Sequence, residues 1–329
     1  MIGEMYMRRP EAGRKKGKQS MAKKTSIGGQ ALLEGIMMRG PVKTAMAVRD
    51  PEGKIVLEEH PTKGKDRAKF FKLPVIRGVF NMVDSFSSGY KYLMRSAEIC
   101  GADAEEERKR AERGKKWYDG VVDKLIMPVA TVLAVALAFV LFLWMPMQLW
   151  KWLCIPFPRL TEMYFWRAVF EGVIRIFIFI AYVWATSLMK DIRRTYMYHG
   201  AEHKTIFCYE AGLPLTVENV RKQKRFHPRC GTSFLILVLI VSIVISMFVR
   251  IDNLALRMIV KLLLLPLIVG IGYELIKLAG RKDNRLTRII SAPGVALQHL
   301  TVLEPDDSMI ECAIAAMEKV IPDDGSDEW

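Results

Sequence analysis

Long apolar segments without charged side chains are the clearest pattern along this 329-residue chain. Residues 125–150 contain no charged side chain, and neither do residues 231–249. An α-helix rises ~1.5 Å per residue and needs about 20 apolar residues to cross the ~30 Å hydrocarbon core of a bilayer. Both segments therefore predict transmembrane helices.

Two further segments, residues 168–189 and 258–276, are apolar, but each contains one acidic and one basic residue. These are Glu171 and Arg175 in the first segment, and Lys261 and Glu274 in the second. The first pair has the i, i+4 spacing of an ion pair on a helix, and the second two side chains can snorkel toward the membrane surface. We expect two more transmembrane helices, with buried or re-entrant helices as the alternative.

The segment before the first apolar helix contains a predicted β-hairpin. Two strand-like runs, residues 44–49 and 54–59, flank a turn at Asp50-Pro-Glu-Gly53, and Pro and Gly are typical of such turns. Aromatic residues mixed with Lys and Arg at 79–94 indicate a helix that lies along the membrane interface or packs on the hairpin. Near the C-terminus, Asp306 is placed to cap a further helix.

These patterns predict a mainly α fold: a polytopic membrane protein with about four transmembrane helices, a small N-terminal β-hairpin-containing cytoplasmic region, and C-terminal helices. The expected parts are a basic disordered extension, the N-terminal cytoplasmic region, a four-span membrane domain, and C-terminal cytoplasmic helices with an acidic tail. Their bounds are residues 1–26, 27–120, 121–280 and 281–329, with a cytoplasmic loop at 190–230 inside the membrane domain.

Composition and charge support this division. Hydrophobic residues make up 51% of the chain and charged residues 26%, with a formal net charge of +14. Lys and Arg gather before the first span, after the fourth and in the 190–230 loop, while the connections at 151–167 and 250–257 contain few. The positive-inside rule then places both termini and this loop in the cytoplasm. Membrane lipids are the expected partners; nucleic acid is not, because the basic residues follow the loops and form no patch interleaved with aromatic residues.

The 190–230 loop contains three of the five His and two of the five Cys. His199, Glu202 and His203 form an H-x-x-E-H pattern, whose spacing places both imidazoles and the carboxylate on one face of a helix. Two such imidazoles are half of a zinc site, and the adjacent carboxylate can take a proton from metal-activated water. Glu202 is therefore the predicted catalytic base.

His227 and Cys230 have the H-x-x-C spacing at which a tight turn presents two ligands to one ion, and Cys208 lies between the two motifs as a supporting candidate. The predicted ligands of a divalent transition metal, zinc by preference, are His199, His203, His227 and Cys230. In the alternative interpretation, the His residues lie at the membrane surface and Cys230 is a small buried apolar residue. The Cys spacing favours free thiols over a disulfide framework.

A Gly-rich segment at residues 28–41 is a weaker candidate for chemistry. It lacks the Gly-Lys-Ser/Thr ending of a phosphate loop and the spacing of a dinucleotide motif. We expect a turn-rich strand region here, in which Glu34 and Arg39 are candidates to support the metal loop.

Long motifs in a fixed order resemble those of the YqhQ family of bacterial membrane proteins, which are described as predicted metal-dependent enzymes. The resemblance covers about residues 26–320. It rests on residues 28–41, Tyr198-His-Gly-Ala-Glu-His-Lys204, His227-Pro-Arg-Cys-Gly-Thr-Ser233, residues 288–294 and Glu304-Pro-Asp-Asp-Ser308. It implies a multi-pass protein of the bacterial inner (cell) membrane with a metal site, and it implies no substrate.

We therefore expect an integral membrane, metal-dependent enzyme, a hydrolase acting at the cytoplasmic face. The alternative is a non-enzymatic transport or assembly factor with a structural metal site. Three protein ligands plus water are typical of the first, and four protein ligands of the second.

Overall fold

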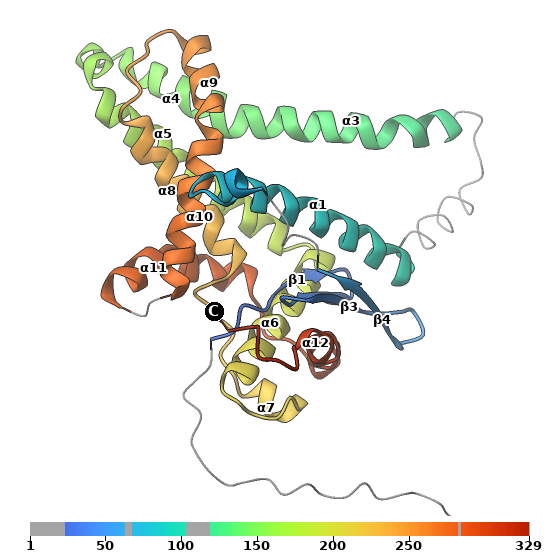
Figure 1. Cartoon of the computed structure of the whole chain (residues 1–329). Helices are drawn as coiled ribbons and strands as arrows, with labels where there is room; N and C mark the ends of the chain where they lie inside the picture. The colour runs from blue at the N-terminus through green and yellow to red at the C-terminus, as the bar shows by residue number, and fades with distance from the viewer. Residues whose placement is uncertain (1–23, 63–67, 103–118, 282–283, 329) are drawn as a thin grey trace, which may run out of the picture.

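The computed structural model describes residues 24–62, 68–102, 119–281 and 284–328 (Figure 1). It is mainly helical, with one small antiparallel sheet near the N-terminus and helices at the C-terminus. This arrangement confirms the predicted mainly α fold with a β-containing N-terminal region. Most of the predicted basic extension lies outside the described residues.

The sheet has four strands in chain order: β1 (Gly28–Leu32), β2 (Gly35–Arg39), β3 (Lys43–Arg49) and β4 (Ile55–Pro61). The predicted hairpin is confirmed as β3–β4, in which Val48 pairs with Val56. Gly53 in its turn has a φ of +84°, which glycine adopts without the steric cost of a Cβ. The Gly-rich segment, predicted to be strand with turns, forms β1 and β2.

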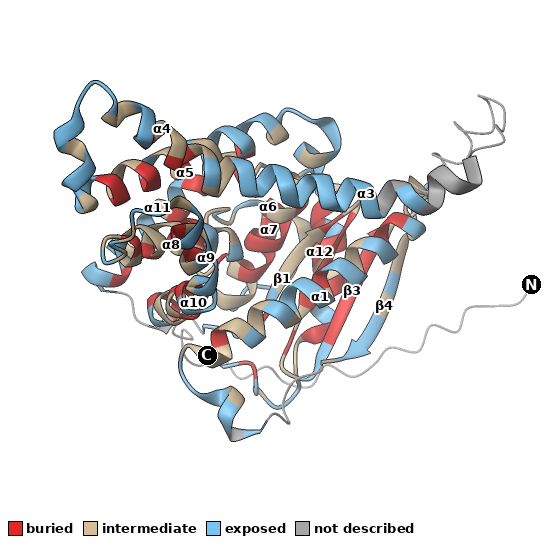
Figure 2. Cartoon of the chain, turned by 90° about the horizontal axis from the view of Figure 1, so that it is seen from above, coloured by how far each residue is buried: buried red, intermediate tan, exposed pale blue. Residues whose placement is uncertain are grey.

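Helices cover both faces of this sheet (Figure 2). They are α1 (Ile76–Ile99), α6 (Lys190–Glu210) and α12 (Asp307–Val320). Strand side chains alternate between faces, so Ile36 and Met38 lie under α6 and α12, whereas Met37 and Met46 lie under α1. Of the two predicted positions for the aromatic-basic helix, packing on the sheet is observed for the C-terminal half of α1.

The remaining helices lie outside the sheet and its three covering helices, or at their border. They are α3 (Asp119–Phe139), α4 (Met145–Cys154), α5 (Tyr164–Ser187), α7 (Val217–Arg221), α8 (Gly231–Ser246), α9 (Leu254–Leu263), α10 (Leu265–Arg281) and α11 (Arg285–Thr301), with short π or 3₁₀ turns η1 (Lys69–Lys72), η2 (Val140–Trp144) and η3 (Pro158–Glu162). Helix α3 projects away from the rest of the chain (Figure 1), and its apolar side chains, such as Val132, are exposed. A helix that is apolar on all sides normally lies in a protein core or in a membrane.

Two of the described helical segments, Pro128–Cys154 and Tyr164–Ser187, are long and apolar enough to cross a membrane. The bent pair Leu254–Leu263 and Leu265–Gly280 is a third if its 43° bend lies within one span. Pro266 lies at this bend, and proline removes a helical hydrogen bond. Helix α8, which corresponds to the predicted span at residues 231–249, is apolar but has only 16 residues. The described residues thus contain two, or up to three, helices of membrane length where the sequence predicts four.

The four charged side chains that the sequence singles out in these apolar helices are paired, and three of them, Glu171, Arg175 and Lys261, are buried. Arg175 donates to Glu171 at 3.3 Å, as the i, i+4 spacing predicts. Lys261, expected to snorkel, instead contacts Glu171 and is 8% exposed. Glu274 forms an ion pair with Arg77 on α1. Pairing explains these positions, because an isolated buried charge is costly.

Gly200 allows α6 to pack directly against another backbone segment. The Cβ of an alanine at this position would lie 1.9 Å from the carbonyl oxygen of Leu303. Overpacking of this kind costs about 1–3 kcal/mol, so we expect Gly200→Ala to lower the melting temperature of the purified protein. Gly231→Ala is the control, because no atom lies within 4 Å of its added Cβ. Equal melting temperatures for both variants would contradict the close packing of α6.

Candidate functional site

Helix α6 positions the H-x-x-E-H residues on a face that turns toward the interior of the chain. Glu202 and His203 are buried there, and His199 is partly buried. Residues three and four positions apart lie on the same helix face, and the centroids of the two imidazole rings are 4.5 Å apart. The predicted helical presentation of the motif is observed.

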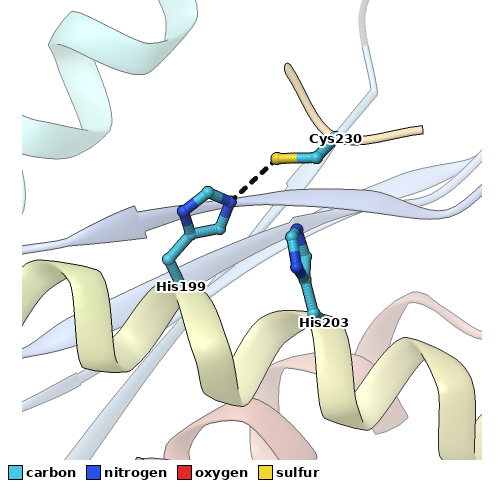
Figure 3. A group of neighbouring side chains, drawn as sticks. All are labelled: His199, His203 and Cys230. Atoms are coloured by element: carbon cyan, nitrogen blue, oxygen red, sulfur yellow. Dashed lines mark hydrogen bonds between the residues drawn. The ribbon is translucent and has the colours of Figure 1, made fainter. Parts of the chain in front are cut away.

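Cys230 forms a cluster with His199 and His203, called here the His/Cys cluster (Figure 3). It ends the turn that starts at His227 and is the N-cap residue of α8. The Cys230 Sγ atom lies 3.1 Å from His199 Nε2, and the potential ligand atoms of all three residues lie within 4.8 Å of one another. The fold thus brings two imidazoles and one thiol to the same point.

Backbone carbonyls hold the second nitrogen of each imidazole. The Nδ1 atom of His199 lies 2.9 Å from the oxygen of Thr301, and Nδ1 of His203 lies 2.5 Å from the oxygen of Arg225. Because a carbonyl oxygen only accepts, each Nδ1 donates, and the resulting tautomer has a lone pair on Nε2. Metal-binding histidines usually have such a partner, which fixes the orientation of the ring.

Burial and neighbouring groups set the protonation of the cluster. Burial lowers the pKa of the His203 imidazole, so this ring is neutral at pH 7. Burial also opposes ionisation of Cys230, but attraction to the His203 ring when that ring is protonated, together with hydrogen bonds from Thr232, holds the pKa of the thiol below its usual value. Neutral imidazole and thiolate are the forms that bind transition metals.

Glu202 lies beside the cluster in a position that depends on Gly29 of β1. Its carboxylate accepts a hydrogen bond from the backbone N–H of Gly29, and burial raises its pKa to about 7. A Cβ at position 29 would lie 2.9 Å from Glu202 Cδ, so glycine is required for this approach. A carboxyl group with this pKa can both accept and release a proton near pH 7.

His227, the fourth predicted ligand, lies next to the cluster but not within it. Its ring centroid is 5.5 Å from that of His203, yet its Nε2 atom lies 3.2 Å from Arg229 and 4.0 Å from Glu210. The side chain of Gln298 bonds both the backbone N–H and the carbonyl of His227, each at 2.8 Å. The structure therefore brings together three of the four predicted ligands and places His227 in a neighbouring polar network.

That network joins the two ends of the described chain. Glu210 and Arg229 form a largely buried ion pair, and Arg229 and His227 hold the pKa of Glu210 below its usual value even though burial opposes ionisation. Thr25, which the sequence places in the disordered extension, is fully buried and donates to Asp327 at 2.7 Å. Sequence reasoning missed the roles of Arg229 and Thr25, for which no local motif gives a signal.

The three supporting candidates lie away from the cluster. Glu34 forms an ion pair with Arg194 at 2.5 Å. Arg39, the last residue of β2, lines a smaller cavity of about 310 Å³. Cys208 is buried, and its thiol lies 3.6 Å from the carbonyl oxygen of Pro214. Their described contacts give none of the three a place at the His/Cys cluster.

A larger cavity, of about 1050 Å³, opens beside the cluster. Its lining includes His199, Glu202 and Cys230, residues 29–31 of β1, and apolar or aromatic side chains from α1, α8 and α10. A large pocket with few polar groups in an apolar wall is the usual form of a ligand-binding site. The cluster is therefore accessible to a molecule in this cavity.

Fold and site together define a helical protein with apolar helices of membrane length and a His/Cys cluster beside a small sheet. A family model described as "Protein of unknown function (DUF1385)" matches residues 73–323. The chain is 33% identical over 298 residues to the uncharacterized protein YqhQ of Bacillus subtilis (strain 168). The matched region covers 90% of this chain and 92% of the relative. The chain therefore belongs to the YqhQ family, as the motifs indicate. No solved structure matches it.

Proposed function

We propose that this protein is an integral membrane, metal-dependent hydrolase that acts at the cytoplasmic membrane face. Its metal is a divalent transition ion, zinc by preference, with His199, His203 and Cys230 as ligands. The observation that carries the proposal is the convergence of these three donors beside a cavity of about 1050 Å³. Catalytic zinc sites use three protein ligands and keep one position open, whereas structural sites use four.

The donor set fits such an ion. The Nε2 atoms of His199 and His203 both accept, and the single S–H of Cys230 can donate to only one of them at a time. A cation would satisfy both lone pairs and the thiolate together, and imidazole and thiolate are donors that zinc prefers. When bound, the metal would supply Lewis-acid chemistry that activates water and polarises a carbonyl or phosphoryl group.

Glu202 is the general base in this proposal. It shares a helix face with both histidines and lines the same cavity as His199 and Cys230. Its carboxylate would accept a proton from the attacking water and return it to the leaving group, while the hydroxyl group of the water goes to the electrophilic centre. Hydrolysis balances in this way without a redox partner.

The alternative is a transport or assembly factor in which the metal only links the loop to the helices. A structural site needs a fourth protein ligand, and His227 is a candidate because its ring centroid lies 5.5 Å from that of His203. To bind, it would have to leave Arg229 and Glu210. The contacts of His227 therefore favour the enzyme.

We further propose that the chain crosses the membrane four times, with both termini and α6 on the cytoplasmic side. Two helices of membrane length, and a third if the bent pair is one span, support this topology. The 16-residue α8 would be the remaining span, and it begins directly after Cys230, so the cluster would lie at the membrane surface. The distribution of Lys and Arg supports the orientation.

Thiol labelling tests this topology. A single cysteine at Glu218 on α7, in a background without other cysteines, should resist impermeant thiol reagents in intact cells, because α7 would face the cytoplasm. A cysteine at Thr161, in the short connection between α4 and α5, should react. Labelling of the Glu218 position from outside the cell would contradict the proposed orientation.

Glu202→Gln tests the enzyme proposal. The substitution keeps the size of the side chain and removes its basicity, so the detergent-purified variant should retain about one equivalent of zinc, as expected for a three-ligand site. General-base catalysis contributes ~10²–10⁴-fold in rate. We therefore expect this variant to fold normally and to fail in complementing a deletion strain.

Two further variants define the outcome. His203→Ala should lose both zinc and complementation, while Cys208→Ala, which removes a buried thiol away from the cluster, should keep both. Full complementation by Glu202→Gln, with failure of His203→Ala, would make the metal structural. Loss of zinc in Glu202→Gln would make Glu202 a ligand and require another base.

A further inference from the structure

We propose that the substrate of this site is a membrane lipid, with its headgroup linkage at the His/Cys cluster and its apolar chain along the wall of the large cavity. The proposal rests on the proposed hydrolase function and topology, and it names the substrate class. The bond broken would be the ester or phosphoester that joins the headgroup to the apolar part. The hydroxyl group of water goes to the carbonyl carbon or phosphorus atom, and a proton goes to the leaving oxygen. The step needs no oxidant or reductant.

The cavity of about 1050 Å³ has two kinds of wall. His199, Glu202 and Cys230 form a polar wall that contains the proposed chemistry. Phe234 and Leu235 on α8 also line the cavity, and they follow Cys230 by four and five residues, which is ~6–7.5 Å along a helix axis. A molecule that fills the cavity would therefore have a polar part at the cluster and an apolar part beyond it.

Large apolar side chains on the cavity wall are exposed. Phe86 and Tyr90 of α1 are 64% and 59% exposed, and Leu235 of α8 is 41% exposed. Apolar surface in contact with water is unfavourable, and a gathering of such side chains marks a site for an apolar ligand or a membrane. A hydrocarbon chain in the cavity would remove this surface from water.

The ends of two helices place the cavity at the membrane surface in the proposed topology. Thr232 and Leu235 line it from the first two turns of α8, and Tyr273 and Lys277 line it from the C-terminal half of α10. Both of these helix ends would face the cytoplasm, because α8 follows the 190–230 loop and α10 leads to the C-terminal helices. Tyr and Lys are typical of the membrane interface. A lipid of the cytoplasmic leaflet would thus reach the cavity with its headgroup near the cluster.

Polar groups in the wall bond to one another, which favours a hydrocarbon chain over a peptide. Asn81 of α1 donates to the hydroxyl group of Tyr273 at 2.8 Å, and the side-chain amide of Gln30 donates to the carbonyl oxygen of Gly89 at 3.5 Å. Every peptide unit brings polar groups that cost free energy when they are buried without a partner. A hydrocarbon chain needs no such partner, so these walls fit the apolar part of a lipid.

Lipid turnover by the purified protein tests the inference. The total lipid extract of a deletion strain is offered in detergent micelles to the zinc-loaded protein, and mass spectrometry follows each lipid species. The wild type should consume one species and release its headgroup and its apolar product. Glu202→Gln should consume that species ~10²–10⁴-fold more slowly, as expected for the loss of a general base.

The outcomes separate the substrate class from the hydrolase proposal. If the wild type consumes no lipid while Glu202→Gln fails to complement the deletion strain, the lipid is overturned and the hydrolase proposal stands. Full complementation by Glu202→Gln would end the hydrolase proposal, and the present inference with it.

Phe86→Gln tests the apolar wall separately from the chemistry. Because Phe86 is largely exposed, the variant should keep its zinc content and its melting temperature. The lost contact with the lipid chain should slow consumption of the same species on the order of tenfold at limiting lipid.

The matched control is Val83→Gln on the same helix. Val83 is 54% exposed and lies outside the described lining of the cavity, so this variant should consume the lipid at the wild-type rate. Equal rates for Phe86→Gln and Val83→Gln would contradict a lipid chain bound along this wall.

Discussion

Close contact between α6 and residues 301–304, which include the last residue of α11 and the extended chain after it, fixes the position of the chemical groups in the site. The segment follows α6 through contacts at Tyr196, His199 and Lys204. This approach is possible because Gly200 has no side chain between the two backbones. The same helix packs on the sheet through its other face, so a shift of α6 would move both imidazoles relative to the sheet and to the turn that ends at Cys230.

Polar groups buried together must satisfy one another, and this requirement shapes the site. The Nδ1 atoms of His199 and His203 each donate to a backbone carbonyl. The Glu202 carboxylate accepts a hydrogen bond from the backbone N–H of Gly29. The side chain of Gln298 bonds to the backbone of His227. At the His/Cys cluster, the Nε2 atoms of two imidazoles lie close to one sulfur atom. Residues 29–31 of β1 line the cavity beside this point.

Local spacing in the sequence predicted the features that depend on local geometry. The shared helix face of His199 and His203, the β3–β4 hairpin and the ion pair of Glu171 with Arg175 all follow from residues a few positions apart. The contact of Thr301 with His199 joins residues 102 positions apart, and no local pattern encodes it. The H-x-x-C spacing predicts a turn but not the direction of the His227 ring, which the distant Glu210 helps to set. Apolar run length likewise did not reveal that α8 ends after 16 residues.

X-ray absorption spectroscopy of the zinc-loaded, detergent-purified protein tests the central claim most directly, because it counts the donor atoms around the ion. The account predicts one sulfur at about 2.3 Å and two imidazole nitrogens at about 2.0–2.1 Å. The remaining donor should be a light atom without the scattering pattern of an imidazole ring, and Cys230→Ala should abolish the sulfur contribution. A spectrum with a third imidazole would make the site a closed structural one that includes His227. A spectrum without sulfur, or a protein that binds no zinc, would contradict the cluster itself.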